Sequence, residues 1–240
     1  MSVIELTDIT ASYGEQRILE HFNLTVEQGT FLTIIGSSGC GKTTALKLMN
    51  GLLTPEKGTV RINGEDIART DIHELRRNIG YVIQEIGLFP HMTIEKNISY
   101  VPNLYKEKDK AAISARAREL AETVGLSPDM LARYPSELSG GQRQRAGIAR
   151  ALMNRPKIIL MDEPFGAVDE ITRRKLQEEI LRIHGELGGT IVFITHDIEE
   201  ALKLGSRVLV MDEGQIIQDG TPTEVRNHPA TDFVRRLVGG

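Results

Sequence analysis

The chain of 240 residues has no tryptophan, one cysteine and few aromatic side chains, which make up 5% of the sequence. A single cysteine can form neither an internal disulfide nor a thiolate metal site, which fits a reducing compartment and predicts a cytoplasmic location. The longest apolar stretches, such as KIILM and TIVFIT, fall far short of the roughly 20 residues that a membrane span needs. The N-terminus lacks the charged and then apolar layout of a signal peptide. If the protein works at a membrane, another chain is expected to cross it.

An excess of positive charge is also missing. The 29 basic and 33 acidic residues give a net charge of -4, so no global positive field draws the chain to nucleic acid or anionic lipid. Hydrophobic residues make up 40% and charged residues 26%, which excludes bulk disorder and a fibrous repeat. We therefore expect a packed globular protein without a nucleic-acid partner.

Strand-like and helix-like segments alternate along much of the chain. Strands are predicted at residues 3–9, 22–26, 30–35, 59–62, 79–83, 157–161, 190–195 and 207–211. Because helical patterns separate the last three, the class is α/β, with a largely parallel sheet covered on both faces. The stretch 86–155 is rich in alanine and charge with helical spacing, which predicts an inserted helical subdomain. We thus expect one domain over residues 1–240, with a core of 1–85 and 156–240.

A complete phosphate-binding loop follows the predicted strand at 30–35. The segment GSSGCGKT matches G-x-x-x-x-G-K-[ST] between a strand and a helix. Its glycines let successive N–H groups face inward, and the following helix presents its positive end to the same anion. Lys42 is expected to reach the outer phosphates, and the Thr43 hydroxyl to ligate Mg²⁺. A glycine turn with a chance lysine is the disfavoured alternative, and Cys40 is interpreted as a small loop filler. The predicted nucleotide-binding residues here are Gly36, Ser37, Ser38, Gly39, Cys40, Gly41, Lys42, Thr43 and Thr44.

Two adjacent carboxylates end the predicted strand at 157–161. Open α/β sheets bind ligands at the carboxyl ends of their strands, so Asp162 and Glu163 are placed for chemistry. We expect Asp162 to hold Mg²⁺ through its water shell, and Glu163 to act as the general base that polarises an attacking water. Taken alone, a pair of solvated turn acids would be an equal alternative. In a chain that also carries the phosphate loop, that alternative is disfavoured.

The segment LSGGQ predicts a second anion-binding surface. Ser139 offers a hydroxyl, and Gly140 and Gly141 leave the backbone bare at the start of a helix that continues with Gln142. By itself this segment would be better interpreted as a serine-glycine helix start with a solvated basic first turn.

These motifs together resemble the nucleotide-binding subunits of ATP-binding cassette (ABC) transporters. The resemblance rests on the phosphate loop and on the LSGGQ, LMDEP and THD segments, and it covers essentially the whole chain. It implies a P-loop NTPase with a RecA-like core of mostly parallel sheet, an antiparallel β subdomain and the helical insertion. It further implies ATP and Mg²⁺ as cofactors, and a head-to-tail homodimer that clamps each ATP between the phosphate loop of one protomer and LSGGQ of the other.

The resemblance also implies roles for single residues. Tyr13 would stack on adenine, Gln84 would sense Mg²⁺ and water, and His196 would contact the γ-phosphate. Asp169 keeps a role across the dimer, whereas Gly166 stands where the family often has serine. Without the resemblance, Tyr13 is interpreted as a surface residue in a turn and Gln84 as a solvated residue at the end of a strand. His196 is then interpreted as a polar neighbour of a helix cap. No position that handles nucleotide is degenerate, so an active ATPase is expected.

The string YVIQEIGLFPHMTI at Tyr81–Ile94 resembles the subunits of importers for quaternary-amine osmoprotectants such as glycine betaine, carnitine and choline. The resemblance implies a transmembrane permease and an extracytoplasmic solute-binding protein as partners, with this chain peripheral on the inner face of the cell membrane. Its apolar residues Ile86, Leu88, Phe89 and Met92 are candidates for the surface that receives the permease, or they pack the helical subdomain. Another solute such as an amino-acid derivative, solute export, a non-transport cassette ATPase and a small-molecule kinase remain alternatives.

Osmoprotectant members of the family often continue into a pair of regulatory CBS domains. The 240 residues contain none. A short member, a paralogue for another solute and a truncated chain are all compatible with this.

Overall fold

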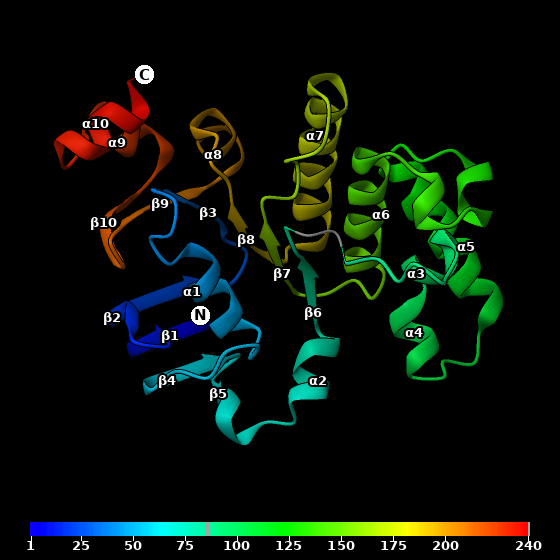
Figure 1. Cartoon of the computed structure of the whole chain (residues 1–240), viewed down its shortest axis with the longest axis horizontal. Helices are drawn as coiled ribbons and strands as arrows, with labels where there is room; N and C mark the ends of the chain where they lie inside the picture. The colour runs from blue at the N-terminus through cyan, green and yellow to red at the C-terminus, as the bar shows by residue number, and fades with distance from the viewer. Residues whose placement is uncertain (85–86, 240) are drawn as a thin grey trace. The chain divides into compact units, whose positions relative to one another are not determined.

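A computed structural model of the chain describes residues 1–84 and 87–239 (Figure 1). It divides into two compact units. The first unit combines Met1–Arg76 with Gly188–Gly240, and the second unit is Arg77–Leu187. Within the described residues, no helix combines the length and the apolar character that crossing a bilayer requires.

The first unit contains an antiparallel sheet with the strand order β2-β1-β4-β5. Its strands are β1 (Ser2–Tyr13), β2 (Gln16–Glu27), β4 (Lys57–Ile62) and β5 (Glu65–Asp66). In the second half of β2 every other side chain is buried, as expected of a strand with one face on a core. Asn63 and Gly64 connect β4 to β5 with φ values of 52° and 82°, the left-handed pair that a tight hairpin turn requires.

The first unit also holds β3 (Phe31–Gly36), which pairs in parallel with β8 (Thr190–Ile194) and β9 (Arg207–Asp212). All residues of β3 and β8 are buried, which explains why both segments are almost entirely apolar. A further strand, β10 (Gln215–Gly220), pairs with β9 in the antiparallel sense. The predicted parallel arrangement is thus present, and β10 adds a strand that the sequence pattern did not predict.

Helices of the first unit cover these strands. Helix α1 (Lys42–Met49) contacts strands of both sheets. Three short helices, α8 (Ile198–Leu204), α9 (Pro222–Asn227) and α10 (Asp232–Val238), share one apolar cluster with β3 and β9. The remaining helical segments before the second unit are η1 (Ile67–Arg69) and α2 (Ile72–Arg77).

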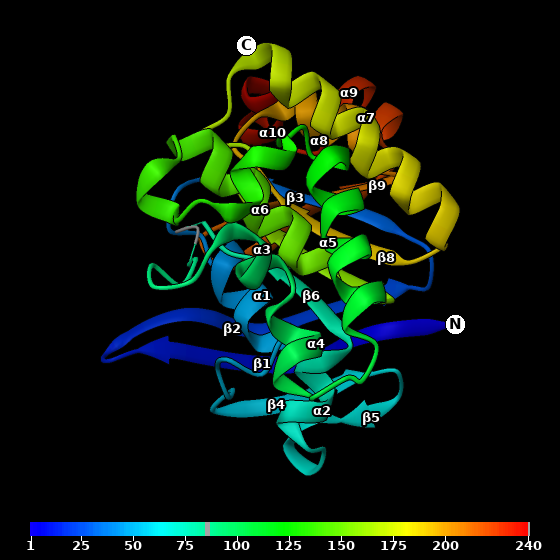
Figure 2. The ribbon, with the colours of Figure 1, turned by 90° about the vertical axis from the view of Figure 1, so that its right-hand side faces the viewer.

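The second unit combines helices with the parallel strand pair β6 (Ile79–Val82) and β7 (Ile158–Asp162). Its described helices are α3 (Ile94–Ile98), α4 (Tyr100–Leu104), α5 (Lys110–Thr123), η2 (Pro128–Ala132), η3 (Pro135–Glu137), α6 (Gly140–Leu152) and α7 (Glu170–Leu187). Helix α6 is central, because it contacts α3, α5 and β6 (Figure 2). The unit is wider than the helical subdomain predicted at 86–155, since β6, β7 and α7 cluster with these helices.

Candidate functional site

The phosphate-binding loop between β3 and α1 depends on three glycines in the first unit. Gly36, Gly39 and Gly41 have φ values of 151°, 77° and 103°. A Cβ on Gly36 would lie 1.9 Å from the carbonyl oxygen of Met211, and one on Gly41 would lie 2.7 Å from a methyl carbon of Leu19. Both the backbone torsion and the packing against neighbouring strands therefore require glycine at these two positions.

Lys42 places its positive charge within this loop. Its side chain is only 5% exposed, and its ammonium donates hydrogen bonds to the carbonyl oxygens of Gly36 at 2.9 Å and Ser37 at 2.7 Å. Gly41 is the N-cap of α1 and has no side chain to accept from the first N–H groups of that helix. The loop thus combines a held ammonium with uncapped helix N–H groups, an arrangement suited to phosphate.

The other predicted loop residues occupy different depths. Cys40 and Thr44 are buried, and Thr43 is partly exposed in the first turn of α1. Ser38 and Gly39 are exposed at the tip of the loop. Ser37 donates a hydrogen bond from its hydroxyl to Asp212 at the end of β9, which fixes one side of the loop to the sheet.

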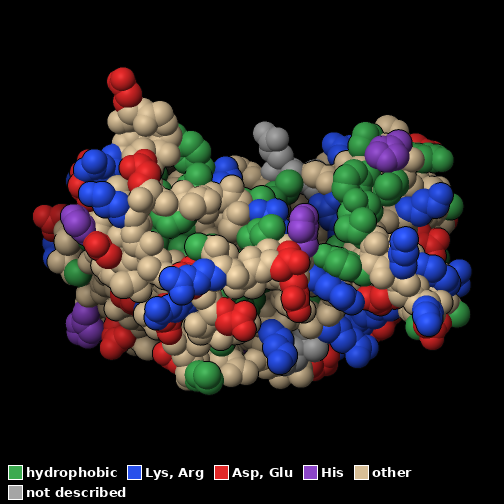
Figure 3. Space-filling view, turned by 90° about the horizontal axis from the view of Figure 1, so that it is seen from below, with side chains coloured by type: hydrophobic (Ala, Val, Ile, Leu, Met, Phe, Trp, Pro, Cys, Tyr) green, Lys and Arg blue, Asp and Glu red, His purple; other side chains and the backbone are tan. Residues whose placement is uncertain are grey.

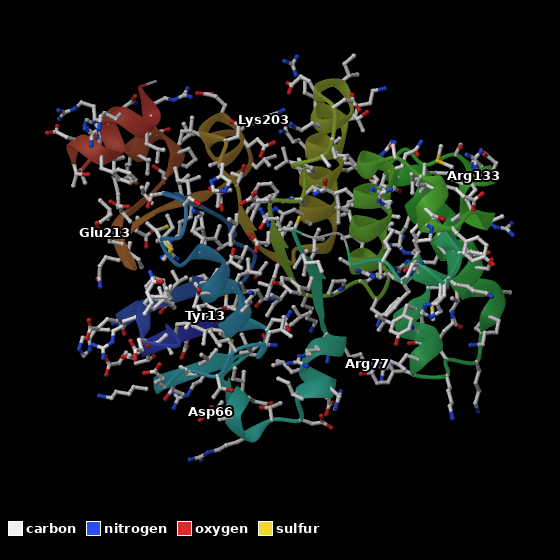
Figure 4. All side chains as sticks on the ribbon, viewed as in Figure 1. Tyr13, Asp66, Arg77, Arg133, Lys203 and Glu213 are labelled. Carbon is white, nitrogen blue, oxygen red and sulfur yellow. The ribbon has the colours of Figure 1, made fainter. Side chains whose placement is uncertain are left out.

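Tyr13 ends β1 and is 49% exposed, with its position labelled in Figure 4. The ammonium of Lys47, a residue of α1, lies 5.9 Å from the centre of the Tyr13 ring. An exposed aromatic ring beside the helix that follows the loop is chemically suited to stack on a nucleotide base.

His196 follows β8, the strand next to β3. Thr195 donates to the buried carboxylate of Glu200 at 2.6 Å, and Asp197 caps α8 by accepting from the backbone N–H of Glu199 and Glu200. These two neighbours fix the turn, and His196 between them is exposed. Because β3 and β8 are parallel, His196 leaves the sheet at the same edge as the phosphate-binding loop.

In the second unit, β7 delivers Asp162 and Glu163 at its carboxyl end. Asp162 is 2% exposed, whereas Glu163 is partly exposed and has a left-handed φ of 47°. A left-handed glutamate is strained, and such strain concentrates at functional sites. The side-chain amide of Gln84 donates to Glu163 Oε2 at 3.0 Å. The structure therefore joins two residues whose roles were predicted from separate segments.

The LSGGQ segment begins α6. The hydroxyl of Ser139 accepts from the backbone N–H of Gln142, and the Gln142 side chain accepts in return from the N–H of Ser139 at 2.8 Å. This capping box shapes the predicted anion-binding surface. A Cβ on Gly141 would lie 2.9 Å from the carbonyl oxygen of Ala167, so this glycine lets α6 approach the loop that follows Glu163.

Gln144 is a residue of this region that the sequence analysis missed. It is 3% exposed, donates to the carbonyl oxygen of Glu163 at 3.0 Å and accepts from the N–H of Ala167 at 2.9 Å. The only signal in the sequence was the position of Gln144, a polar residue four positions before Ile148 on the apolar face of the helix.

Asp169 caps α7 by accepting from the backbone N–H of Thr172 at 3.0 Å. This hydrogen bond, followed by one from the Thr172 hydroxyl, holds the pKa of Asp169 below its ordinary value, and the charge of Arg145 acts in the same direction. Arg145 itself donates to the carbonyl oxygen of Gly125 at 2.7 Å. Asp169 is exposed, as a role toward a second chain would require.

The predicted docking segment is ordered by one buried amide. The side chain of Asn97 accepts from the N–H of Phe89 at 2.8 Å, and its nitrogen lies 3.0–3.1 Å from the carbonyl oxygens of Phe89, Met92 and Thr93. Leu88, Phe89 and Met92 are partly exposed. Ile86, which was also predicted for this surface, lies outside the described residues.

The predicted metal ligands are all oxygen donors. They are the Thr43 hydroxyl, the Asp162 carboxylate and the Gln84 amide oxygen, and hard oxygen ligands suit Mg²⁺. Among residues 1–84 and 87–239, no group of three or more His, Cys, Asp or Glu side chains is arranged to hold a metal. In each unit, the predicted donor atoms are thus of the type that Mg²⁺ takes, and Mg²⁺ usually keeps several water ligands and contacts substrate phosphates. Figure 3 shows basic and acidic side chains interspersed on one face of the molecule, in keeping with their similar numbers.

The loop, the held lysine and the strand-end carboxylates define the class of P-loop nucleotide-binding proteins, and comparison with known proteins gives the family. A family model described as "ABC transporter" matches residues 19–166. The glycine betaine/carnitine/choline transport ATP-binding protein OpuCA of Bacillus subtilis is 49% identical over 99% of this chain and 62% of its own length. The glycine betaine uptake system ATP-binding protein YehX of Escherichia coli is 46% identical over 99% of this chain and 77% of its own.

Among solved structures, a dimeric bacterial ABC transporter cassette superposes with a TM-score of 0.85 at 35% identity, over 91% of this chain and 98% of its own. The chain belongs to the ABC transporter family. The predicted resemblance and the predicted α/β P-loop NTPase fold are confirmed. The chain spans about three fifths of the length of OpuCA, 62%.

Proposed function

We propose that this chain is the ATP-hydrolysing, energy-coupling subunit of an ABC importer for quaternary-amine osmoprotectants such as glycine betaine, carnitine or choline. The observation that carries the proposal is the Glu163 carboxylate at the end of a buried strand, oriented by the amide of Gln84. A base held in this way, in a chain that also has a complete phosphate-binding loop, is suited to direct water at a phosphoryl group.

The first unit binds the nucleotide in this proposal. The N–H groups of the loop and of the first turn of α1 hold the phosphates, and Lys42 exchanges its carbonyl partners for phosphate oxygens. Tyr13 stacks on the adenine ring, and His196 contacts the γ-phosphate. Ser37 keeps the loop attached to Asp212 at the end of β9.

The second unit activates water. Glu163 accepts the proton of the attacking water, while the hydrogen bond from Gln84 to Oε2 fixes the plane of the carboxylate. Thr43, Asp162 and Gln84 would hold Mg²⁺, which neutralises charge on the phosphate oxygens when it is bound. Catalysis then depends on orientation and charge, as in phosphoryl transfer generally.

A head-to-tail homodimer is part of the proposal. The similar solved cassette is described as dimeric, and a second one, of 33% identity, is described as a dimer in a post-hydrolysis state bound to ADP and Pi. In such a dimer the α6 N-terminus, with Ser139, Gly140, Gly141 and Gln142, faces the nucleotide of the partner protomer. Asp169, which is exposed, also reaches across.

A transmembrane permease and an extracytoplasmic solute-binding protein complete the proposed importer, with this chain on the cytoplasmic face of the membrane. The solute class rests on the names of OpuCA and YehX, which match 99% of this chain. The permease and the solute-binding protein would recognise the solute, so a change of solute would require no change in the nucleotide-binding residues of this chain.

The test is affinity purification of tagged Glu163→Gln protein from detergent-solubilised membranes of the source organism with ATP, followed by mass spectrometry. The variant should retain ATP and its partners, so a multi-span permease and a solute-binding protein should co-purify. The double variant Glu163→Gln, Lys42→Ala is the control, because it should no longer be held closed by ATP. Recovery of ribosomal proteins without a permease would overturn the importer assignment. The recovered solute-binding protein is then screened with betaine, choline and carnitine, and failure to bind any of them would overturn the proposed solute class.

A further inference from the structure

The side chain of Gln144 links helix α6 to the backbone around Glu163. Its nitrogen donates to the carbonyl oxygen of Glu163 at 3.0 Å, and its oxygen accepts from the N–H of Ala167 at 2.9 Å. The side chain is 3% exposed, so both ends of this amide are used in a site shielded from water. A buried amide with both ends satisfied fixes its partners more strongly than an exposed one would.

The segment that Gln144 holds is strained. Glu163 has a φ of 47°, a region that glutamate rarely adopts and that persists only where its surroundings impose it. Its carbonyl oxygen also accepts from the N–H of Gly166 at 3.3 Å, which closes a local turn. Gln144 provides the contact from outside this turn, and the direction of the Glu163 side chain follows from the backbone torsions that these bonds impose.

A further contact joins the start of α6 to the same loop. Gly141 packs so closely that a Cβ there would lie 2.9 Å from the carbonyl oxygen of Ala167. Gln144 and Gly141 therefore connect two parts of the loop, at Glu163 and at Ala167, to the first turns of one helix.

We propose that Gln144 is a positioning residue for hydrolysis, which sets the backbone of Glu163 and thereby ties the orientation of the base to the LSGGQ helix. The inference rests on the proposed function, because it assigns Gln144 a role through Glu163. In the dimer, the helix that meets the nucleotide of the partner is then the same helix that orients the base of its own chain. Closure around one nucleotide is thereby coupled to readiness for hydrolysis of the other.

The first test compares Gln144→Met with Gln218→Met in the full chain. Gln218, in the first unit, forms the same pair of bonds, donating to the carbonyl oxygen of His228 at 3.0 Å and accepting from the N–H of Ala230 at 2.8 Å. Gln144→Met should lower kcat by between about 10-fold and about 100-fold, the effect of a misplaced catalytic group, and leave the ATP dissociation constant within about threefold of wild type. Gln218→Met should leave kcat unchanged. A folded Gln144→Met protein with wild-type kcat would overturn the inference.

A double-mutant cycle separates positioning from general stability. If Gln144 acts through Glu163, adding Gln144→Met to Glu163→Gln should cause no further loss of kcat. Losses that multiply would overturn the inference and leave the proposed function standing. Absence of ATP hydrolysis by the wild-type chain together with its partners would instead overturn the proposed function, and the inference with it.

Gln144→Glu provides a readout that a merely structural role would not give, and it covers the case in which the methionine variant fails to fold. Glutamate keeps the acceptor for Ala167 but can donate to the Glu163 carbonyl only when it is protonated. Burial raises the pKa of a carboxyl group, so the rate relative to wild type should rise as the pH falls from about 8 to about 6. A pH-independent ratio would contradict the proposed donor role.

Discussion

The two units of this protein hold their key charged groups in different ways. In the first unit, main-chain carbonyls hold the Lys42 ammonium, and glycines shape the loop around it. In the second unit, the side-chain amides of Gln84 and Gln144 hold the carboxylate and the backbone of Glu163. In the proposed function, phosphate binding thus depends on the backbone conformation of the loop, whereas water activation depends on individual side chains. The first unit should therefore determine affinity and the second unit turnover.

The strongest test of this comparison is Glu163→Gln. Removal of the proposed general base should lower kcat by about 100-fold to about 10,000-fold, while the ATP dissociation constant stays near the wild-type value. Steady-state kinetics with equilibrium nucleotide binding measures both. Glu178→Gln, which removes an exposed charge from α7, is the matched control and should leave both unchanged. An unchanged rate in Glu163→Gln would remove Glu163 as the base.

Lys42→Ala should mainly weaken ATP binding, whereas Glu163→Gln should mainly lower kcat. Hydrogen bonds to charged groups contribute about 1.5–3 kcal/mol, so the ATP dissociation constant should rise by about 10-fold to about 100-fold. Lys47→Ala, on the same helix, removes an equal charge and should cause a much smaller change. If the two variants bind ATP equally, the affinity reflects general charge rather than the held ammonium. Isothermal titration with a slowly hydrolysed analogue decides between these results.

Neighbouring glycines of α6 provide a smaller and more local test. An added Cβ would lie 2.9 Å from the Ala167 carbonyl oxygen at Gly141, but at Gly140 it would lie 3.7 Å from the Ala167 side chain, an ordinary contact. Gly140→Ala should stabilise the protein by up to about 1 kcal/mol through helix propensity. Gly141→Ala should destabilise it by about 1–3 kcal/mol through overpacking. Urea denaturation measures the change in the free energy of unfolding for each variant. The same sign for both changes would show that α6 does not pack closely against the loop that follows Glu163.

The smallest expected effect concerns acid stability, where the two units should behave alike. Hydrogen bonds from Thr172 hold the pKa of Asp169 below its ordinary value, and those from Thr221 do the same for Glu224. A carboxylate with a lowered pKa contributes stability that is fully present above its unfolded pKa and is lost as the pH falls through its folded pKa. The difference in Tm between wild type and Asp169→Asn or Glu224→Gln should therefore shrink below about pH 4. A difference that persists at pH 3 would show that the charge is not the cause.

Local motifs made much of the fold and the candidate site predictable. The phosphate-binding loop is contiguous in sequence, and its strand and helix are adjacent to it, so local pattern is enough. The parallel strands β3 and β8 are almost entirely apolar, which the sequence also shows directly. Strand β10 was missed because its residues are exposed or partly exposed without alternation, and α9 because it has only six residues.

Contacts between distant residues were not predictable from this one sequence. Gln144 lies 19 residues from Glu163 and 23 from Ala167, so no local pattern connects them. The pairing of Gln84 with Glu163 spans 79 residues. Gln84 was named because of family resemblance, but its partner required a structure. The left-handed torsion of Glu163 was likewise invisible, because glutamate has no preference for it.

The buried amide of Asn97 bears on how a subunit of the proposed kind could come to bind a different permease. One side chain at the base of the segment Phe89–Thr93 fixes that segment's backbone, while Leu88, Phe89 and Met92 remain accessible in part. Shape and surface chemistry are therefore specified by different residues. In the proposed importer, the outward side chains of this segment could change to suit a different permease, while Asn97 keeps the backbone of the segment in the same conformation.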